Sequence, residues 1–148
     1  MEQKKVTQSK ETAILAVAGG LGFWAANFAI SMTPIAADYR TALSIAYFPM
    51  LLEALLGGLI IGVFVSYYLL RFFEKLPTQN PILKSVFLSF IVLVIVTLLI
   101  EVPAKFLNPT TNALQTFLVG ALFNIIRIPA LGIVIGSLYN WRDGSVKI

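Results

Sequence analysis

Two charged side chains stand inside otherwise apolar stretches of the sequence, and they are its strongest candidates for chemistry. Glu53 interrupts the apolar stretch 43–70, and Arg127 lies within the apolar stretch 113–139. A charge at the centre of a bilayer costs on the order of 2.5–3.5 kcal/mol, so such residues usually face the protein interior and pair with one another. We therefore predict that Glu53 and Arg127 meet, directly, through Asn124 or through one water.

Three further polar residues are expected at a similar depth. At about 1.5 Å per helical residue, Glu53 and Arg127 lie roughly 27 Å and 22 Å from the basic residues that follow their stretches. Asn27, Asn124 and Glu101 fall at comparable heights, which predicts one polar cluster in the outer half of the bilayer. Glu101 directly precedes a Val-Pro pair, which favours the outer headgroup layer for this side chain over the cluster.

Two interpretations of the cluster remain open. In the first, Glu53 and Arg127 form a structural pair that fixes the register of the helices. In the second, they form a site for a substrate or a proton. Ionisable residues inside membranes serve both purposes.

Most catalytic chemistry is excluded by composition, because the sequence contains neither cysteine nor histidine. Disulfides, thiolate sites, haem held by His and His general bases are therefore absent. The serines within the apolar stretches lack a partner that would activate them. We expect no enzymatic activity, no catalytic residue, no metal site and no cofactor.

The balance of apolar and charged residues points to lipid as the solvent. Hydrophobic residues make up 58% of the 148 residues and charged residues 12%, against about 25% charged in soluble domains. A soluble domain of this length could not bury so much apolar surface. The net charge of +4 comes with no nucleic-acid recognition motif, so no nucleic-acid partner is expected.

Four apolar stretches are long enough to cross a membrane, which takes about 20 helical residues. They cover approximately 13–32, 43–70, 82–100 and 113–139, and lipid requires each to be a helix. The first is longer than the apolar core of about 7–15 residues in a signal peptide, so we expect a membrane helix there. Pro49 and Pro129 predict kinks inside their spans. With no linker in 1–148, the sequence predicts one domain: an all-α, polytopic, four-helix transmembrane bundle.

The basic residues predict that both termini lie in the cytoplasm, with the chain in a cell membrane. Eight Lys or Arg residues flank the spans on one side and two flank them on the other, which is a strong positive-inside bias. The eight are Lys4, Lys5, Lys10, Arg71, Lys75, Lys84, Arg142 and Lys147, and the two are Arg40 and Lys105.

Paired glycines predict close contacts between helices. Gly58 and Gly62 in the second span, and Gly132 and Gly136 in the fourth, have the four-residue spacing that lets helix backbones approach. The strings GLIIG and GIVIG begin five residues after Glu53 and Arg127 respectively. The match indicates two parallel hairpin repeats or a coincidence, and both remain open. A true repeat would place the charges near a pseudo-twofold axis, as in some transporters.

Two classes of function follow. The short loops and small-residue faces favour an accessory or self-associating membrane subunit, with lipid and either further copies or other membrane subunits as its partners. The alternative is a small oligomeric transporter or channel that uses the Glu53 and Arg127 layer.

Overall fold

The protein is described by a computed structural model that covers residues 2–107 and 112–146, with side chains at 7–104, 106–107 and 112–142. This part of the chain is helical and has no strand. The segments Thr7–Ser31, Tyr47–Lys75, Pro81–Ala104 and Ala113–Arg142 are long and apolar enough to cross a membrane. The prediction of four spans is therefore confirmed. Met1, residues 108–111, Lys147 and Ile148 lie outside the described residues.

The helices follow one another in a simple order along the chain. They are α1 (Glu2–Ser31), α2 (Pro34–Ala42), α3 (Tyr47–Phe72), η1 (Phe73–Lys75), α4 (Pro81–Val96), the π-helix η2 (Thr97–Glu101), α5 (Val102–Phe106) and α6 (Ala113–Val146).

Two of the helix boundaries differ from the sequence prediction. α1 begins at Glu2 instead of near residue 13, because no proline interrupts the polar segment that precedes the apolar stretch. Residues 34–42 form the separate helix α2, which Pro34 opens and the Thr33 hydroxyl caps by accepting a hydrogen bond from the Ala36 N–H. The second span consequently starts at Tyr47. Pro49 thus lies in the first turn of α3, where its missing N–H breaks no helical hydrogen bond.

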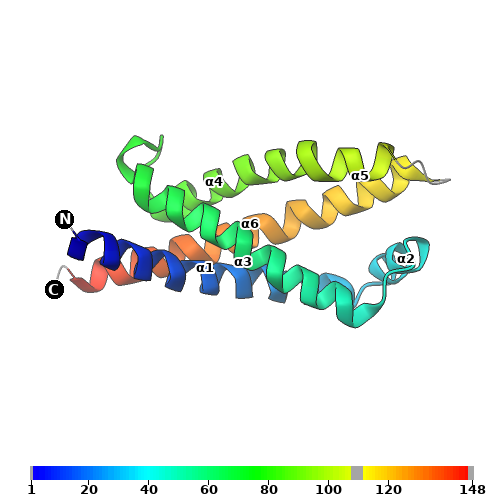
Figure 1. Cartoon of the computed structure of the whole chain (residues 1–148), viewed down its shortest axis with the longest axis horizontal. Helices are drawn as coiled ribbons and strands as arrows, with labels where there is room; N and C mark the ends of the chain where they lie inside the picture. The colour runs from blue at the N-terminus through cyan, green and yellow to red at the C-terminus, as the bar shows by residue number, and fades with distance from the viewer. Residues whose placement is uncertain (1, 108–111, 147–148) are drawn as a thin grey trace.

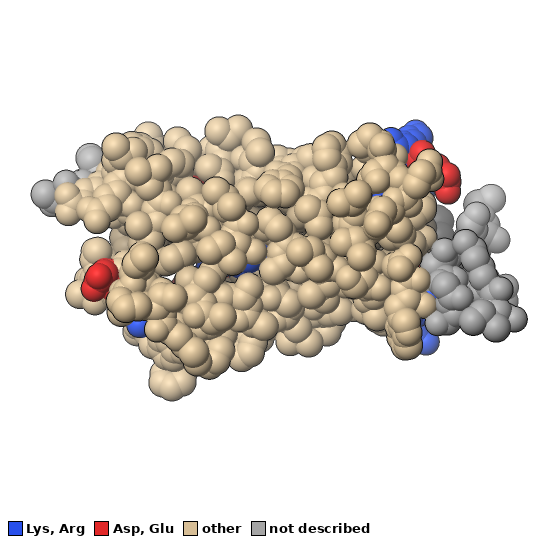
Figure 2. Space-filling view, turned by 180° about the vertical axis from the view of Figure 1, so that it is seen from behind, with Lys and Arg blue, Asp and Glu red and all other residues tan. Residues whose placement is uncertain are grey.

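The bundle has two distinct ends (Figure 1). Both termini and the connection between α3 and α4 lie at one end, which we call the terminal end. α2 and α5 lie at the other, which we call the α2 end. On the face drawn in Figure 2, charged side chains gather near the two ends, and the long middle section is almost free of them.

The four long helices do not pack equally. α1 packs closely against α3 and α6, and α4 packs closely against α6, whereas α3 meets α4 and α6 only sparsely. Fully buried apolar side chains fill the contacts among α1, α3 and α6: Leu15, Val65, Leu69, Ile128, Leu131 and Ile135.

The paired glycines sit at the two close contacts within the hairpins. A Cβ placed on Gly62 would lie 2.6 Å from the Ala16 carbonyl oxygen of α1. A Cβ on Gly136 would lie 2.5 Å from the Ile82 Cα of α4. Gly58 and Gly132 likewise face α1 and α4. Each pair therefore packs against the other long helix of its own hairpin, α3 on α1 and α6 on α4.

A buried lysine joins α3 to α4 at the terminal end. Lys84 of α4 is only 2% exposed, and its Nζ donates a hydrogen bond of 2.5 Å to the Phe73 carbonyl oxygen. The same Nζ lies 3.6 Å from the centroid of the Phe73 ring, within the range of a cation–π contact. In the sequence, Lys84 was one of eight basic residues that flank the spans. In the structure, its side chain joins the end of α3 to the first turns of α4.

At the α2 end, a short polar network holds α2 against the end of α1. Arg40 donates a hydrogen bond of 3.1 Å to the Ser31 carbonyl oxygen, at the last residue of α1. Its guanidinium also lies 5.0 Å from the centroid of the Tyr47 ring. A cation at a helix C-terminus is favourable because the last carbonyls lack partners within the helix.

Candidate functional site

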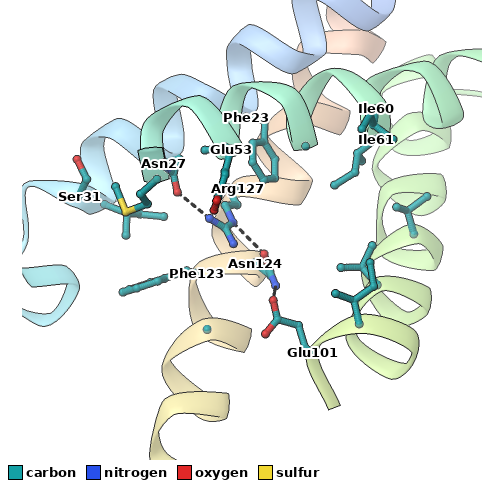
Figure 3. Close-up of a pocket in the computed structure, with 18 of the residues that line it drawn as sticks. Phe23, Asn27, Ser31, Glu53, Ile60, Ile61, Glu101, Phe123, Asn124 and Arg127 are labelled. Atoms are coloured by element: carbon teal, nitrogen blue, oxygen red, sulfur yellow. Dashed lines mark hydrogen bonds between the residues drawn. The ribbon is translucent and has the colours of Figure 1, made fainter. Parts of the chain in front are cut away.

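A chain of hydrogen bonds links α1, α6 and the π-helix η2 in the interior (Figure 3). Arg127 donates from Nε to the Asn124 Oδ1 at 2.8 Å and from Nη1 to the Asn27 Oδ1 at 2.7 Å. The amide of Asn124 in turn donates to the Glu101 Oε1 at 3.3 Å. The structure thus brings together four of the five polar residues that the sequence placed at one depth.

Local geometry explains how each side chain reaches this network. Asn124 and Arg127 are three residues apart on α6 and therefore share a face. Glu101 comes from η2, where the Val102 N–H bonds to the Thr97 carbonyl oxygen five residues earlier. The extra residue turns the following side chains by about 100° relative to a regular α-helix. Such π-turns are frequent at functional sites.

Glu101 therefore differs from its expected position in the headgroup layer. The sequence signal for that layer was the Val-Pro pair that follows Glu101. In the structure, Pro103 lies in the first turn of α5, and the π-helix before it directs the carboxylate toward Asn124.

The predicted contact between Glu53 and Arg127 stays a prediction. Among the described residues, no ion pair joins them, and the hydrogen bonds of Arg127 and Asn124 go to Asn27 and Glu101. Both side chains nevertheless line the same cavity. A contact through one water stays a prediction.

The polar network lines the middle of a cavity of about 730 Å³, which also reaches Ala36 and Tyr39 of α2. Pockets of about 300–1,000 Å³ are typical of small-molecule sites. Glu53, Asn27 and Arg127 line the same cavity, Glu53 from the side of α3 (Figure 3). Towards the terminal end its walls become apolar, with Ile60, Ile61 and Phe64 from α3 and Val92, Ile95 and Val96 from α4.

The cavity opens sideways between α3 and α4. Ile60, Phe64 and Ile95 line it and are nevertheless 59%, 53% and 48% exposed. Side chains that belong both to a cavity and to the outer surface mark its rim. Because this rim lies within spans suited to a membrane, the opening faces the position of lipid tails.

Two donor groups beside the cavity are not used in the hydrogen bonds described above, and one wall leaves free space. The Asn27 Nδ2 is buried and has no hydrogen-bond partner in the structure. The hydrogen bonds of Arg127 use Nε and Nη1, and not Nη2. A Cβ added to Gly57 would meet no atom within 4 Å, so the cavity has free space beside α3. An unsatisfied buried donor costs about 1–3 kcal/mol, so a ligand that supplied an acceptor here would be stabilised.

Comparison with protein-family models, with curated proteins and with solved structures finds no match for this chain. The described residues contain no group of three side chains suited to a metal ion. Function must therefore be inferred from the cavity itself.

Sequence reasoning did not identify the cavity, the contribution of η2 or the free space at Gly57. The one signal available for Gly57 was its four-residue spacing from Glu53, which places both on one face of α3. Phe123 also went unnoticed, although its ring lies 5.4 Å from that of Tyr39 and lines the cavity.

Proposed function

We propose that this protein is a small membrane transporter whose substrate occupies the cavity between α3 and α4. The observation that carries the proposal is the combination of about 730 Å³ of space, a polar network in its wall and a sideways apolar opening. Concave, mostly apolar sites with a few convergent polar groups are the usual form of ligand sites. Oligomerisation is not needed to build this site, since one chain lines it.

The alternative function, an accessory or self-associating subunit, has less support. The main sequence evidence for this alternative was the two glycine-containing helix faces, one with Gly58 and Gly62 and the other with Gly132 and Gly136. Gly62 and Gly136 contact α1 and α4 of the same chain, so these faces are already occupied within one protomer. The transporter proposal, by contrast, rests on the cavity between α3 and α4, which no side chain fills.

We further propose that both termini lie in the cytoplasm and that the chain lies in the cell membrane. The proposal rests on the bias of basic residues towards the terminal end. Fusions of a reporter at Gln79 and Ile148 should report the cytoplasmic side, and a fusion at Asn108 the opposite side. An Ile148 fusion that reports outside would contradict both the orientation and the even number of crossings.

Filling the cavity tests the proposed function. In Gly57→Leu, the side chain extends into free space, so the bundle should stay folded while the substrate is displaced. Native mass spectrometry should find a small-molecule adduct on the wild-type chain, purified from its membrane, that Gly57→Leu lacks. Gly57→Ala is the matched control, because one methyl group leaves most of the volume, and it should keep the adduct.

The same variants connect binding to transport. Proteoliposomes that hold the wild-type chain should release the identified compound at least tenfold faster than those that hold Gly57→Leu. If wild-type and Gly57→Leu carry identical adducts, or neither carries any, the cavity holds no substrate and the proposal is wrong.

A further inference from the structure

We propose that the cavity takes a zwitterionic amphiphile, with its anionic group at Arg127 and Asn27, its amine at Glu53 and its apolar tail between α3 and α4. This inference rests on the proposed function, because it names the class of substrate for the same cavity. Each of the three parts of the ligand corresponds to a separate feature of the structure.

The anionic group is indicated by two donors on neighbouring side chains. Arg127 Nη1 bonds the Asn27 Oδ1 at 2.7 Å, so the Nδ2 of that same amide lies one amide width away from the guanidinium. That Nδ2 has no partner, in a residue only 4% exposed. The two hydrogen bonds of Arg127 hold its guanidinium in one orientation, with Nη2 not used by either. A phosphate or carboxylate in the cavity could accept from Arg127, and from the Asn27 Nδ2 once the side chains that cover this atom move aside. Such charge-assisted bonds are strong.

The amine is indicated by the carboxylate of Glu53. Glu53 lines the cavity from α3, and the described residues give it neither a hydrogen bond nor an ion pair. Glu101, by contrast, already accepts a bond from Asn124. Glu53 is exposed within a span suited to a membrane, and a carboxylate there is stabilised by a nearby cation.

The separation of the charges favours a ligand that carries both signs. Glu53, Glu101 and Arg127 give the cavity two carboxylates and one guanidinium. Net charge alone would favour a monocation, because one amine would balance the second carboxylate. The unbonded Asn27 Nδ2 beside Arg127 adds a position for an anionic group, and a zwitterion occupies both positions.

The tail is indicated by the apolar walls on the terminal side of Glu53. Phe64 follows Glu53 by eleven residues, which corresponds to roughly 16 Å along α3. Over this length Ile60, Phe64 and Ile95 form walls that also reach the outer surface. An alkyl chain could lie there with one side against the protein and the other against lipid.

Four probes separate the parts of this ligand. They are a lysophosphatidylethanolamine with a twelve-carbon chain, dodecyl phosphate, dodecylamine and phosphoethanolamine, each titrated against the full chain in a nonionic detergent. The lysophosphatidylethanolamine should bind at least tenfold more tightly than any of the other three. Equally tight binding of phosphoethanolamine would show that the ligand is a water-soluble zwitterion, and would overturn the assignment of the apolar tail.

The variant Glu53→Gln provides the decisive comparison, because Glu53 has no described bond on which folding would depend. It should lower the affinity for lysophosphatidylethanolamine at least tenfold and leave the affinity for dodecyl phosphate unchanged or higher. Glu74→Gln, which removes an exposed carboxylate at the end of α3, is the matched control and should change neither. Arg127→Gln, if it folds, should abolish the binding of dodecyl phosphate.

The outcomes distinguish this inference from the proposed function. If Glu53→Gln binds lysophosphatidylethanolamine as the wild type does, the amine has no site at Glu53 and the inference is wrong. If no probe binds while Gly57→Leu still removes an adduct from the wild-type chain, the substrate belongs to another class and the proposed function stands. If no adduct depends on Gly57, the proposed function itself fails.

Discussion

Gly62→Leu should prevent assembly of the folded bundle, whereas Gly57→Leu, five residues earlier on the same helix, should leave it intact. A Cβ at Gly62 would lie 2.6 Å from the carbonyl oxygen and 3.2 Å from the Cα of Ala16. These are backbone atoms and cannot rotate away, so α1 and α3 would have to separate. Overpacking a well-packed contact costs about 1–3 kcal/mol and sometimes more, and here we expect at least the upper end of that range.

The measurement is the temperature at which the purified chain loses monodispersity on size exclusion in mild detergent. Gly57→Leu should match or slightly exceed the wild type, because replacing a helical glycine removes a propensity penalty of about 1 kcal/mol. Gly136→Leu should resemble Gly62→Leu, since its Cβ would meet the Ile82 Cα at 2.5 Å. Wild-type behaviour of Gly62→Leu would mean that α1 and α3 do not make this close approach.

The second large effect is expected from Arg127→Gln. The guanidinium bonds to both asparagines, and the Glu101 carboxylate attracts its charge across the Asn124 amide. Removal of one member of a buried charged network costs about 3–5 kcal/mol in soluble proteins, because the opposite charge is left uncompensated. Arg127→Gln should therefore be strongly destabilised, and Arg71→Gln, at an exposed arginine, should not.

A double-mutant cycle identifies the carboxylate that compensates Arg127. The variant that combines Arg127→Gln with Glu101→Gln should recover part of the stability that Arg127→Gln loses. The combination with Glu53→Gln should instead be additive, because no hydrogen bond or ion pair joins Glu53 to Arg127 among the described residues. Recovery with Glu53→Gln and additivity with Glu101→Gln would show that α3 lies closer to α6 than the structure places it.

These residues also show what the sequence could reveal. Hydropathy and length located the four spans, because lipid requires each long apolar stretch to be helical. Counting residues along the helix axis gave the correct common height for Asn27, Asn124 and Arg127. The same count could not give the direction of each side chain, so it could not show that Arg127 bonds to Asn27 and Asn124.

Glycine spacing illustrates the same limit. The pattern indicated that Gly58, Gly62, Gly132 and Gly136 permit close approach, but it did not say which helix each pair would meet. Glu101 reaches the polar network because the turn Thr97–Glu101 contains one extra residue. No residue pattern in this apolar stretch predicts that turn. The cavity depends on the divergence of α3 from α4, a property of the whole bundle.

The bond from Lys84 to Phe73 ties the two hairpins together at the terminal end. Glu53 lies twenty residues before Phe73, roughly 30 Å away along the helix. Between these two residues, Gly58 and Gly62 hold α3 against α1, so the position of Glu53 depends on the contact with α1 more than on the bond to α4. The side opening between α3 and α4 is therefore a seam between two separately packed hairpins that Lys84 joins at the terminal end.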